Sequence, residues 1–291
     1  MRYFDYTTMS DFLRCHYYYY YRHIRHLVPI LKPTYFGFGS AWHAGLEVLH
    51  KGGTLKEAQD KFNDEYKDTQ EDAMRTVARG QKMLELYTIK YKFDPYQVLY
   101  AETPFHIALD DFILCGRCDA ITKHKVDGHI YLKEVKTSSR TGASYFEKFT
   151  FNYQIDIYTI GCLELMGDCA GALIDVAKLT SSAPKADDFE RDLAGRSYIA
   201  LEASKKHIVN IVKSIISIES FFRLQDGEGV SVYAPDWELG YFNKEKCYDY
   251  GKCVYSDICK TNLDERALKK FKEVGWNAEE GKEIEIRKEE T

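Results

Sequence analysis

Three charged side chains in the middle of the sequence could do chemistry together: Asp119, Glu134 and Lys136. They belong to residues 111–137, DFILCGRCDAITKHKVDGHIYLKEVKT, where two apolar runs flank an Asp-Gly pair. This pattern predicts two β-strands joined by a tight turn. Side chains alternate across a strand, so Glu134 and Lys136 share a face. Folding the hairpin would bring the Asp119 carboxylate beside Glu134.

Such a group could hold a divalent metal ion. Two carboxylates close together repel each other unless a cation lies between them. Hard oxygen ligands favour Mg²⁺ or Mn²⁺, and a neighbouring lysine can polarise a water or stabilise developing negative charge. Two carboxylates, a divalent ion and a lysine are the groups that metal-assisted phosphodiester hydrolysis uses. The simpler interpretation is a solvated strand ending in Glu-Val-Lys, because charge clusters are often structural.

A second candidate site is formed by cysteines. Cys247, Cys253 and Cys259 fall in the short polar segment KCYDYGKCVYSDIC, which has no core to bury three thiols. In a reducing compartment such a group indicates metal or cluster ligation rather than disulfides. Three thiolates need a fourth ligand, for which Cys15 is the candidate. Four thiolates suit Zn²⁺ or an iron–sulfur cluster, and the five-residue gaps, longer than usual zinc pairs, favour the cluster.

Composition limits the class of protein. The chain has 291 residues, of which 45% are hydrophobic, so it is long enough for a substantial core. Its net charge of −5 means that any nucleic-acid site must be a local basic patch. We find neither a secretion signal nor a run of membrane-spanning length, and expect a cytoplasmic protein with no membrane partner. The remaining cysteines are expected to be small core residues: Cys115, Cys118, Cys162 and Cys169.

The elements that must position these groups can be read from hydrophobic spacing. A first helix is predicted over residues 8–26 with Ser10 as N-cap, and a second begins after Ser40 as its N-cap. Two or three more helices are predicted within 54–93. Another follows the loop after Lys136 and ends at about residue 166, and the last covers 198–224. Strands are predicted over 97–107, in the hairpin, and over 170–179, and residues 186–197 are expected to form a polar connection. The predicted parts of one integrated domain are a helical part (1–96), a central core (97–226) and a C-terminal cysteine segment with a charged tail (227–291).

Four short motifs, in this order, carry a resemblance to a known family. They are GSAWH ending at His43, GRCD ending at Asp119, the Glu134-Val135-Lys136 element, and Gln154 with Tyr158 four residues later on one helix face. Together they resemble the PD-(D/E)XK nuclease superfamily, in particular its RecB-like branch with an iron–sulfur cluster. That branch includes CRISPR-associated adaptation exonucleases and the nuclease domains of AddB-type helicase–nucleases.

The resemblance implies a fold and a set of site residues. The fold is α/β, with a restriction-endonuclease-like mixed central sheet flanked by helices, a helical N-terminal part and a cysteine-ligated C-terminal segment. His43, Asp119, Glu134 and the Val135 carbonyl would hold one or two Mg²⁺ or Mn²⁺ ions. Lys136 would orient or deprotonate the attacking water. Gln154 and Tyr158 would engage the DNA backbone.

The cysteine pattern resembles the family's split [4Fe–4S] cluster, with one ligand near the N-terminus and three near the C-terminus. The implied ligands are Cys15, Cys247, Cys253 and Cys259, with a zinc site as the alternative. The pattern departs from the family in one place. The usual gap between the second and third cysteines is two residues, whereas here it is five, and Tyr250 occupies the expected position.

The resemblance implies a metal-dependent DNA exonuclease of a prokaryotic or phage-infected cell, acting in DNA repair, recombination or CRISPR adaptation. Its expected partners are DNA, with single-stranded ends, and a helicase or a recombination or integration protein. One alternative is a non-catalytic DNA-binding or adaptor protein that keeps the fold and the cluster. Another is a structural protein stabilised by zinc.

Overall fold

The computed structural model describes residues 1–31, 34–227, 243–248, 251–261 and 264–284, with side chains up to Ser220 in the last long helix. It divides into two compact units. Unit 1 consists of Met1–Leu31, His106–Gly116 and the described part of Ala203–Thr291. Unit 2 consists of the described part of Lys32–Phe105 together with Arg117–Glu202.

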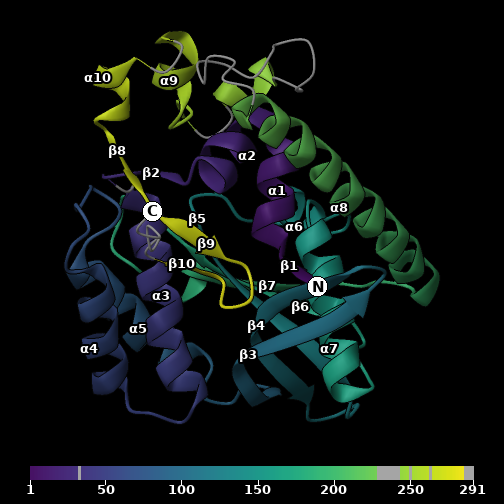
Figure 1. Ribbon diagram of the computed structural model, residues 1–291. Coiled ribbons are helices and arrows are strands. Elements are labelled where there is room, and N and C mark those ends of the chain that lie inside the picture. The colour runs from purple at the N-terminus through teal and green to yellow at the C-terminus, as the bar shows by residue number, and fades with distance from the viewer. Residues whose placement is uncertain (32–33, 228–242, 249–250, 262–263, 285–291) are drawn as a thin grey trace. The chain divides into compact units, whose positions relative to one another are not determined.

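The helices and strands follow one another along the chain as shown in Figure 1. The first part contains β1 (Arg2–Phe4), α1 (Tyr6–Arg14), α2 (His16–Tyr19), a π-helical turn η1 (Tyr20–Ile24), β2 (Leu27–Pro29), α3 (Thr34–His50), α4 (Leu55–Tyr66) and α5 (Val77–Lys90). The middle contains β3 (Tyr96–Leu109), β4 (Phe112–His124), β5 (Ile130–Ser138), α6 (Ala143–Glu147), α7 (Tyr153–Met166), β6 (Ala172–Lys178), a 3₁₀ turn η2 (Ala186–Asp188) and β7 (Phe189–Ala194). The last part contains α8 (Tyr198–Gly227), a 3₁₀ turn η3 (Lys244–Cys247), α9 (Ser256–Thr261), α10 (Glu265–Leu268), β8 (Phe271–Glu273), β9 (Gly275–Asn277) and β10 (Lys282–Ile284).

Among the described residues, six strands form a mixed sheet in the order β1-β4-β5-β6-β7, with β3 also paired to β4. The pairs β1–β4 and β5–β6 are parallel, whereas β4–β5 and β6–β7 are antiparallel. In unit 2, α3 and α7 both contact β5. The predicted α/β fold with a mixed sheet flanked by helices is confirmed.

The predicted hairpin is β4 and β5, paired from Ala120 with Lys133 to Lys123 with Ile130. Its turn has Gly128 at φ 77°, a conformation that glycine adopts without the steric cost of a Cβ. Helix α7 begins where the Asn152 side chain accepts hydrogen bonds from the Gln154 and Ile155 amides, and ends at Gly167 in a left-handed conformation. The hairpin and this capped helix are the elements that carry most of the candidate site.

The core of unit 2 lies between helices α3, α4 and α5 and strands β5 to β7. Its centre is aromatic, since the Trp42 and Phe189 rings stack with centroids 6.1 Å apart and Tyr87 meets Phe189 edge-on at 5.5 Å. Val135 on β5 joins this cluster. The core therefore fixes α3 and β5 against each other, and both elements carry candidate site residues.

A buried ionic network also ties β5 to its neighbours. Lys133 Nζ lies 2.9 Å from Asp175 Oδ2 on β6, and Arg191 Nη2 on β7 lies 2.9 Å from the same oxygen. The Tyr87 hydroxyl donates to Asp175 at 2.6 Å and accepts from Lys133 at 2.7 Å. Burial alone raises the pKa of Asp175, but attraction from Lys133 and Arg191 outweighs it and holds the pKa well below its usual range.

Three sequence predictions of local structure are wrong. Helix α1 is capped by Asp5, whose side chain accepts from the Thr8 amide at 2.8 Å, so Ser10 lies inside the helix. Helix α3 already runs from Thr34, which places Ser40 in its interior. The expected connection over 186–197 contains strand β7. Its polar sequence does not resemble a strand, but its Arg191 side chain is paired with Asp175 in the buried network.

No described helix is both long and apolar enough to cross a membrane.

Candidate active site

Asp119 is placed at the point where β4 and β5 separate. The regular pairing ends at Ala120 with Lys133. There the Val135 amide donates to Asp119 Oδ2 at 2.7 Å, so a side chain takes the place of a backbone acceptor. The carboxylate is thereby fixed beside the strand that carries Glu134.

Glu134 is 1% exposed, and one of its oxygens is fully engaged. Its Oε1 accepts from Lys136 Nζ at 2.5 Å and from Gln154 Nε2 at 2.8 Å, and Lys136 also donates to Gln154 Oε1 at 3.0 Å. The other oxygen, Oε2, is buried and has no hydrogen-bond partner among the described residues. Burial raises the pKa of Glu134 to about 7, with Lys136 opposing and Asp119 adding to the rise.

The other two predicted residues of the site come from helices. His43 on α3 lies with Nδ1 3.3 Å from Asp119 Oδ1. Burial alone would lower the pKa of His43, but attraction from Asp119 raises it to about 9. Tyr158 lies one turn after Gln154 on α7, and its ring packs against Phe105 at 5.9 Å between centroids.

Glu102 on β3 is a member of this site that sequence reasoning missed. One ligand atom from each of His43, Glu102 and Asp119 can be chosen so that all lie within 4.8 Å of one another. Burial raises the pKa of Glu102 to about 7, and the Asp119 charge adds to it. The backbone at Glu102 has φ 51°, a left-handed conformation within strand β3. Sequence carries no signal for this, because glycine or asparagine usually marks that conformation.

The residues present fit a hard divalent cation. An imidazole and carboxylates are ligands that Mn²⁺ and Mg²⁺ accept. Glu134 Oε2 gives a further reason, because a buried carboxylate oxygen without a hydrogen bond is costly unless a ligand satisfies it. The arrangement can therefore hold a metal ion beside Lys136, a lysine fixed by two hydrogen bonds.

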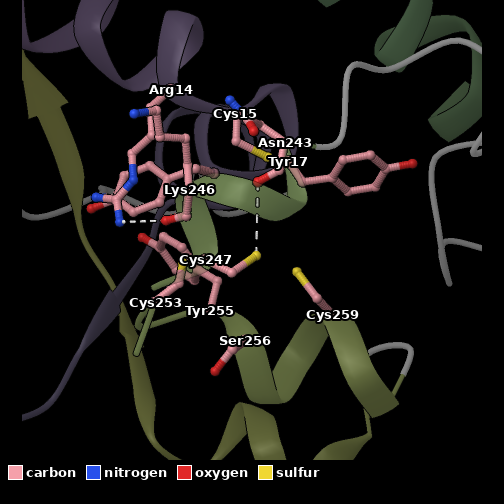
Figure 2. Close-up of a pocket in the computed structure, with 11 residues that line it drawn as sticks. Arg14, Cys15, Tyr17, Asn243, Lys246, Cys247, Cys253, Tyr255, Ser256 and Cys259 are labelled. Atoms are coloured by element: carbon pink, nitrogen blue, oxygen red, sulfur yellow. Dashed lines mark hydrogen bonds between the residues drawn. The ribbon is translucent and has the colours of Figure 1, made fainter. Parts of the chain in front are cut away.

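The four predicted cluster cysteines line one pocket of unit 1, shown in Figure 2. Cys15 lies at the break between α1 and α2, Cys247 ends η3, and Cys259 lies on α9. The Cys253 amide donates to the Cys247 carbonyl at 2.7 Å, which holds these two cysteines close together. Burial raises the pKa of Cys259 to about 12, and the nearby Cys253 and Cys15 thiols add to the rise.

This pocket is built where N-terminal and C-terminal segments of unit 1 pair. Strand β2 is antiparallel to β8, with Leu27 opposite Glu273 and Pro29 opposite Phe271. The Tyr255 hydroxyl donates to the Leu27 carbonyl at 2.6 Å. The Arg14 guanidinium lies over the Tyr18 ring at 4.6 Å and donates to the Lys246 carbonyl. The four thiols thus line one pocket, and the positively charged Arg14 side chain forms part of its wall.

Of the other cysteines, Cys115, Cys118 and Cys162 are fully buried, as predicted. Cys169 is only half-buried, so the prediction of a core residue is wrong for it. It lies in the turn between α7 and β6, where its thiol donates to the Gly171 carbonyl at 3.5 Å.

Comparison with known proteins places this geometry in a family. Residues 4–260 match the family model of the PD-(D/E)XK nuclease superfamily. Among solved structures, the chain is similar to a protein from Eubacterium rectale named "Putative exonuclease", with 12% identity and a TM-score of 0.50. That match covers 90% of this chain and 88% of the other, and it shows likeness of fold. No curated protein matches the sequence.

Proposed function

Because the chain belongs to the PD-(D/E)XK nuclease superfamily, we propose that it is a metal-dependent DNA exonuclease. The observation that carries the proposal is the connected group of Glu134, Lys136 and Gln154 beside Asp119. A solvated strand end would not bury Glu134 to 1% exposure with one oxygen unpaired among the described residues. A substrate with single-stranded ends and a helicase or recombination partner remain part of this proposal.

Each residue has a role in the proposed reaction. His43, Asp119, Glu134 and the Val135 carbonyl would hold Mg²⁺ or Mn²⁺, which would lower the pKa of a bound water and neutralise charge on the scissile phosphate. Lys136 orients the attacking water as an ammonium group, or takes its proton when it is a neutral amine. Its hydrogen bonds to Glu134 and Gln154 aim the side-chain nitrogen. Gln154 thus positions the two catalytic residues, while Gln154 and Tyr158 together face the DNA backbone.

The cysteine pocket is proposed to hold a structural [4Fe–4S] cluster. Four thiols from separate segments that line one pocket fit a four-cysteine ligand set. Ligation would join the segment containing Cys15 to the segment from Cys247 to Cys259, and so contribute to folding without redox chemistry. Cys247 lines the pocket despite the five-residue gap to Cys253, which supports its proposed role as a ligand.

The nuclease proposal is tested with end-labelled single- and double-stranded DNA and either Mg²⁺ or Mn²⁺. We expect nucleotide release from DNA ends that EDTA abolishes, and loss of cleavage in Glu134→Gln with folding retained. DNA binding by the wild-type protein without any cleavage would support the adaptor alternative. Cleavage that survives EDTA would contradict the metal mechanism.

The cluster proposal is tested by metal analysis of protein purified without oxygen. We expect about four iron and four sulfide per chain and a brown colour from thiolate–iron charge transfer. Stoichiometric zinc in a colourless protein would replace the cluster with a zinc site.

A further inference from the structure

We propose that Cys162 and Cys169 form a reversible disulfide when the protein meets a hydroperoxide, with Cys169 as the reactive group and Cys162 as the thiol that resolves it. Both cysteines lie in unit 2, outside the cysteine pocket of unit 1. The pair is a modification site that the proposed nuclease reaction does not use.

The end of helix α7 brings the two cysteines together. Cys162 lies near the end of α7, where Gly167 is left-handed and its amide donates to the Leu163 carbonyl at 2.8 Å. Cys169 follows two residues later, and the Cys162 and Cys169 side chains are hydrogen-bonded to each other. Two sulfurs in such contact need only a small movement to reach the S–S bond length of about 2.05 Å.

The segment that follows Cys169 is held against strand β5. The Ala170 amide donates to the Ile130 carbonyl at 2.8 Å, and the Leu132 amide donates to the Gly171 carbonyl at 3.0 Å. The Cys169 thiol itself lies 3.5 Å from the Gly171 carbonyl oxygen. Backbone hydrogen bonds on both sides of β5's partner segment therefore fix the Cys169 sulfur beside Cys162.

The two thiols differ in the way that a peroxide-reactive pair requires. Cys169 is half-buried and can meet a small oxidant, whereas Cys162 is fully buried. The hydrogen bond from Cys162 lowers the pKa of Cys169; the Leu132 and Gly171 amides add to this effect, and burial and Asp168 oppose it. The same hydrogen bond raises the pKa of Cys162. Because the thiolate is the nucleophile, Cys169 reacts first.

A third thiol lies near the pair and has a different hydrogen-bond partner. Cys118 on β4 is fully buried, and its thiol donates to the Tyr158 carbonyl of α7 at 3.9 Å. Burial raises the pKa of Cys118 well above its usual range. Cys118 is therefore a neighbour against which the assignment of Cys162 as the resolving thiol can be tested.

The reaction balances with the hydroperoxide as oxidant. The Cys169 thiolate attacks one peroxide oxygen, the O–O bond breaks, and the products are a sulfenic acid and a hydroxide or alkoxide that takes up a proton. The Cys162 sulfur then gives up its proton and attacks the sulfenic sulfur, so the S–S bond forms and the S–O bond breaks with release of water. The two thiols lose two electrons, and the peroxide is reduced by the same two. An added dithiol reverses the modification by thiol–disulfide exchange.

The test is peptide mass mapping of the full-length protein after treatment with hydrogen peroxide and alkylation of the remaining thiols in denaturant. Trypsin cuts after Lys148 and after Lys178, and the peptide between them contains no cysteine besides Cys162 and Cys169. We expect this peptide to lose two hydrogen atoms and both alkylation sites, and to regain the alkylation sites after treatment with dithiothreitol. Cleavage at Glu164, between the two cysteines, should leave two halves that separate only on reduction.

Three variants assign the roles of the thiols. Cys162→Ser should stop the reaction at the Cys169 sulfenic acid, which dimedone captures, and Cys169→Ser should leave Cys162 as an alkylatable thiol. Cys118→Ser is the matched control, because it removes a buried thiol near the pair, and disulfide formation should stay within about twofold of the wild-type rate. Circular dichroism checks the fold of each variant, and Cys162→Ala replaces Cys162→Ser if the serine variant does not fold.

Three outcomes would overturn the inference. They are full alkylation of both cysteines after peroxide, a disulfide from Cys169 to Cys118, and wild-type oxidation that goes no further than an acid on Cys169. Because the readout is the mass of one peptide, it does not depend on nuclease activity or on the group held by the cysteine pocket.

Discussion

Asp119 and Glu134 stand on two neighbouring strands of one sheet, whereas Cys15 and Cys259 come from opposite ends of the sequence. The strands bring their carboxylates together through backbone pairing and a turn, before any ligand is considered. The cysteine pocket depends instead on the pairing of β2 with β8 and on a few side-chain contacts such as Tyr255 with Leu27.

The difference separates the two proposed uses of metal in this protein. A site on a hydrogen-bonded sheet can exist without its ion, so removing the ion should abolish chemistry and leave the fold intact. A site assembled from distant segments gains stability from its ligand, because the bound group supplies the connection between them. Four predictions test this distinction.

Asp119→Asn should have the largest effect, and it should be on chemistry alone, because the asparagine oxygen can still accept from the Val135 amide. Loss of this proposed metal ligand should remove several kcal/mol of transition-state stabilisation, or about 10⁴ in cleavage rate. Single-turnover cleavage measures the rate, and thermal melting and iron content should match wild type. A large fall in melting temperature would mean that Asp119 also holds the sheet together.

Asp175→Asn should destabilise unit 2 by about 4 kcal/mol, because it removes the carboxylate paired with the buried Lys133 ammonium and leaves Arg191 with Asp94 alone among the described carboxylates. Since the folded pKa of Asp175 is lowered, its contribution is fully present above about pH 4 and declines below that as the carboxyl protonates. Denaturant unfolding at pH 7 and at pH 3 measures both values.

Asp192→Asn is the control, since Asp192 is exposed on the same strand β7 and, within the described part of the chain, its side chain accepts only from the Leu193 amide. It should change stability by less than about 0.5 kcal/mol. Iron content should be unaffected in both variants if the two sites are held separately.

Cys15→Ser should destabilise unit 1 by about 3 kcal/mol through loss of the bound cluster. Iron content, thermal melting and limited proteolysis of the C-terminal segment report the change. Cys169→Ser, which alters a half-buried thiol outside the pocket, should retain the iron. Full iron with wild-type melting in Cys15→Ser would show that this pocket needs no ligand at that position.

Gln154→Ala should have the smallest effect. It removes the amide that holds both Glu134 Oε1 and Lys136, so the rate should fall about tenfold while Mn²⁺ affinity stays near wild type. Gln154→Glu is the informative companion, because it keeps the length and places a negative charge beside Glu134. If DNA affinity alone falls in Gln154→Ala, the side chain acts on the substrate rather than on Lys136.

The sequence predicts the hairpin well because two local signals agree, alternating apolar residues and an Asp-Gly turn. It predicts β7 poorly because Glu190, Arg191 and Asp192 read as a loop, although Arg191 is satisfied by partners on other elements. Propensity carries no information about such partners.

The residues of the candidate site also differ in whether the sequence alone could identify them. Residues such as Glu134 and Lys136 stand in a short motif and could be named from it. Glu102 has no motif, and its place beside His43 depends on how α3 and β3 meet. Only tertiary structure could therefore identify it.

The alternation of β5 carries one more consequence. Lys133 is locked to Asp175 in the buried network, while the next residue, Glu134, meets Lys136 and Gln154. A one-residue slip of this strand would reverse every side chain. It would place the Glu134 carboxylate against Asp175 and turn Lys133 toward the proposed metal ligands. The buried Lys133–Asp175 ion pair thus sets the register of β5. Residues outside the candidate active site therefore fix the alignment of the residues within it.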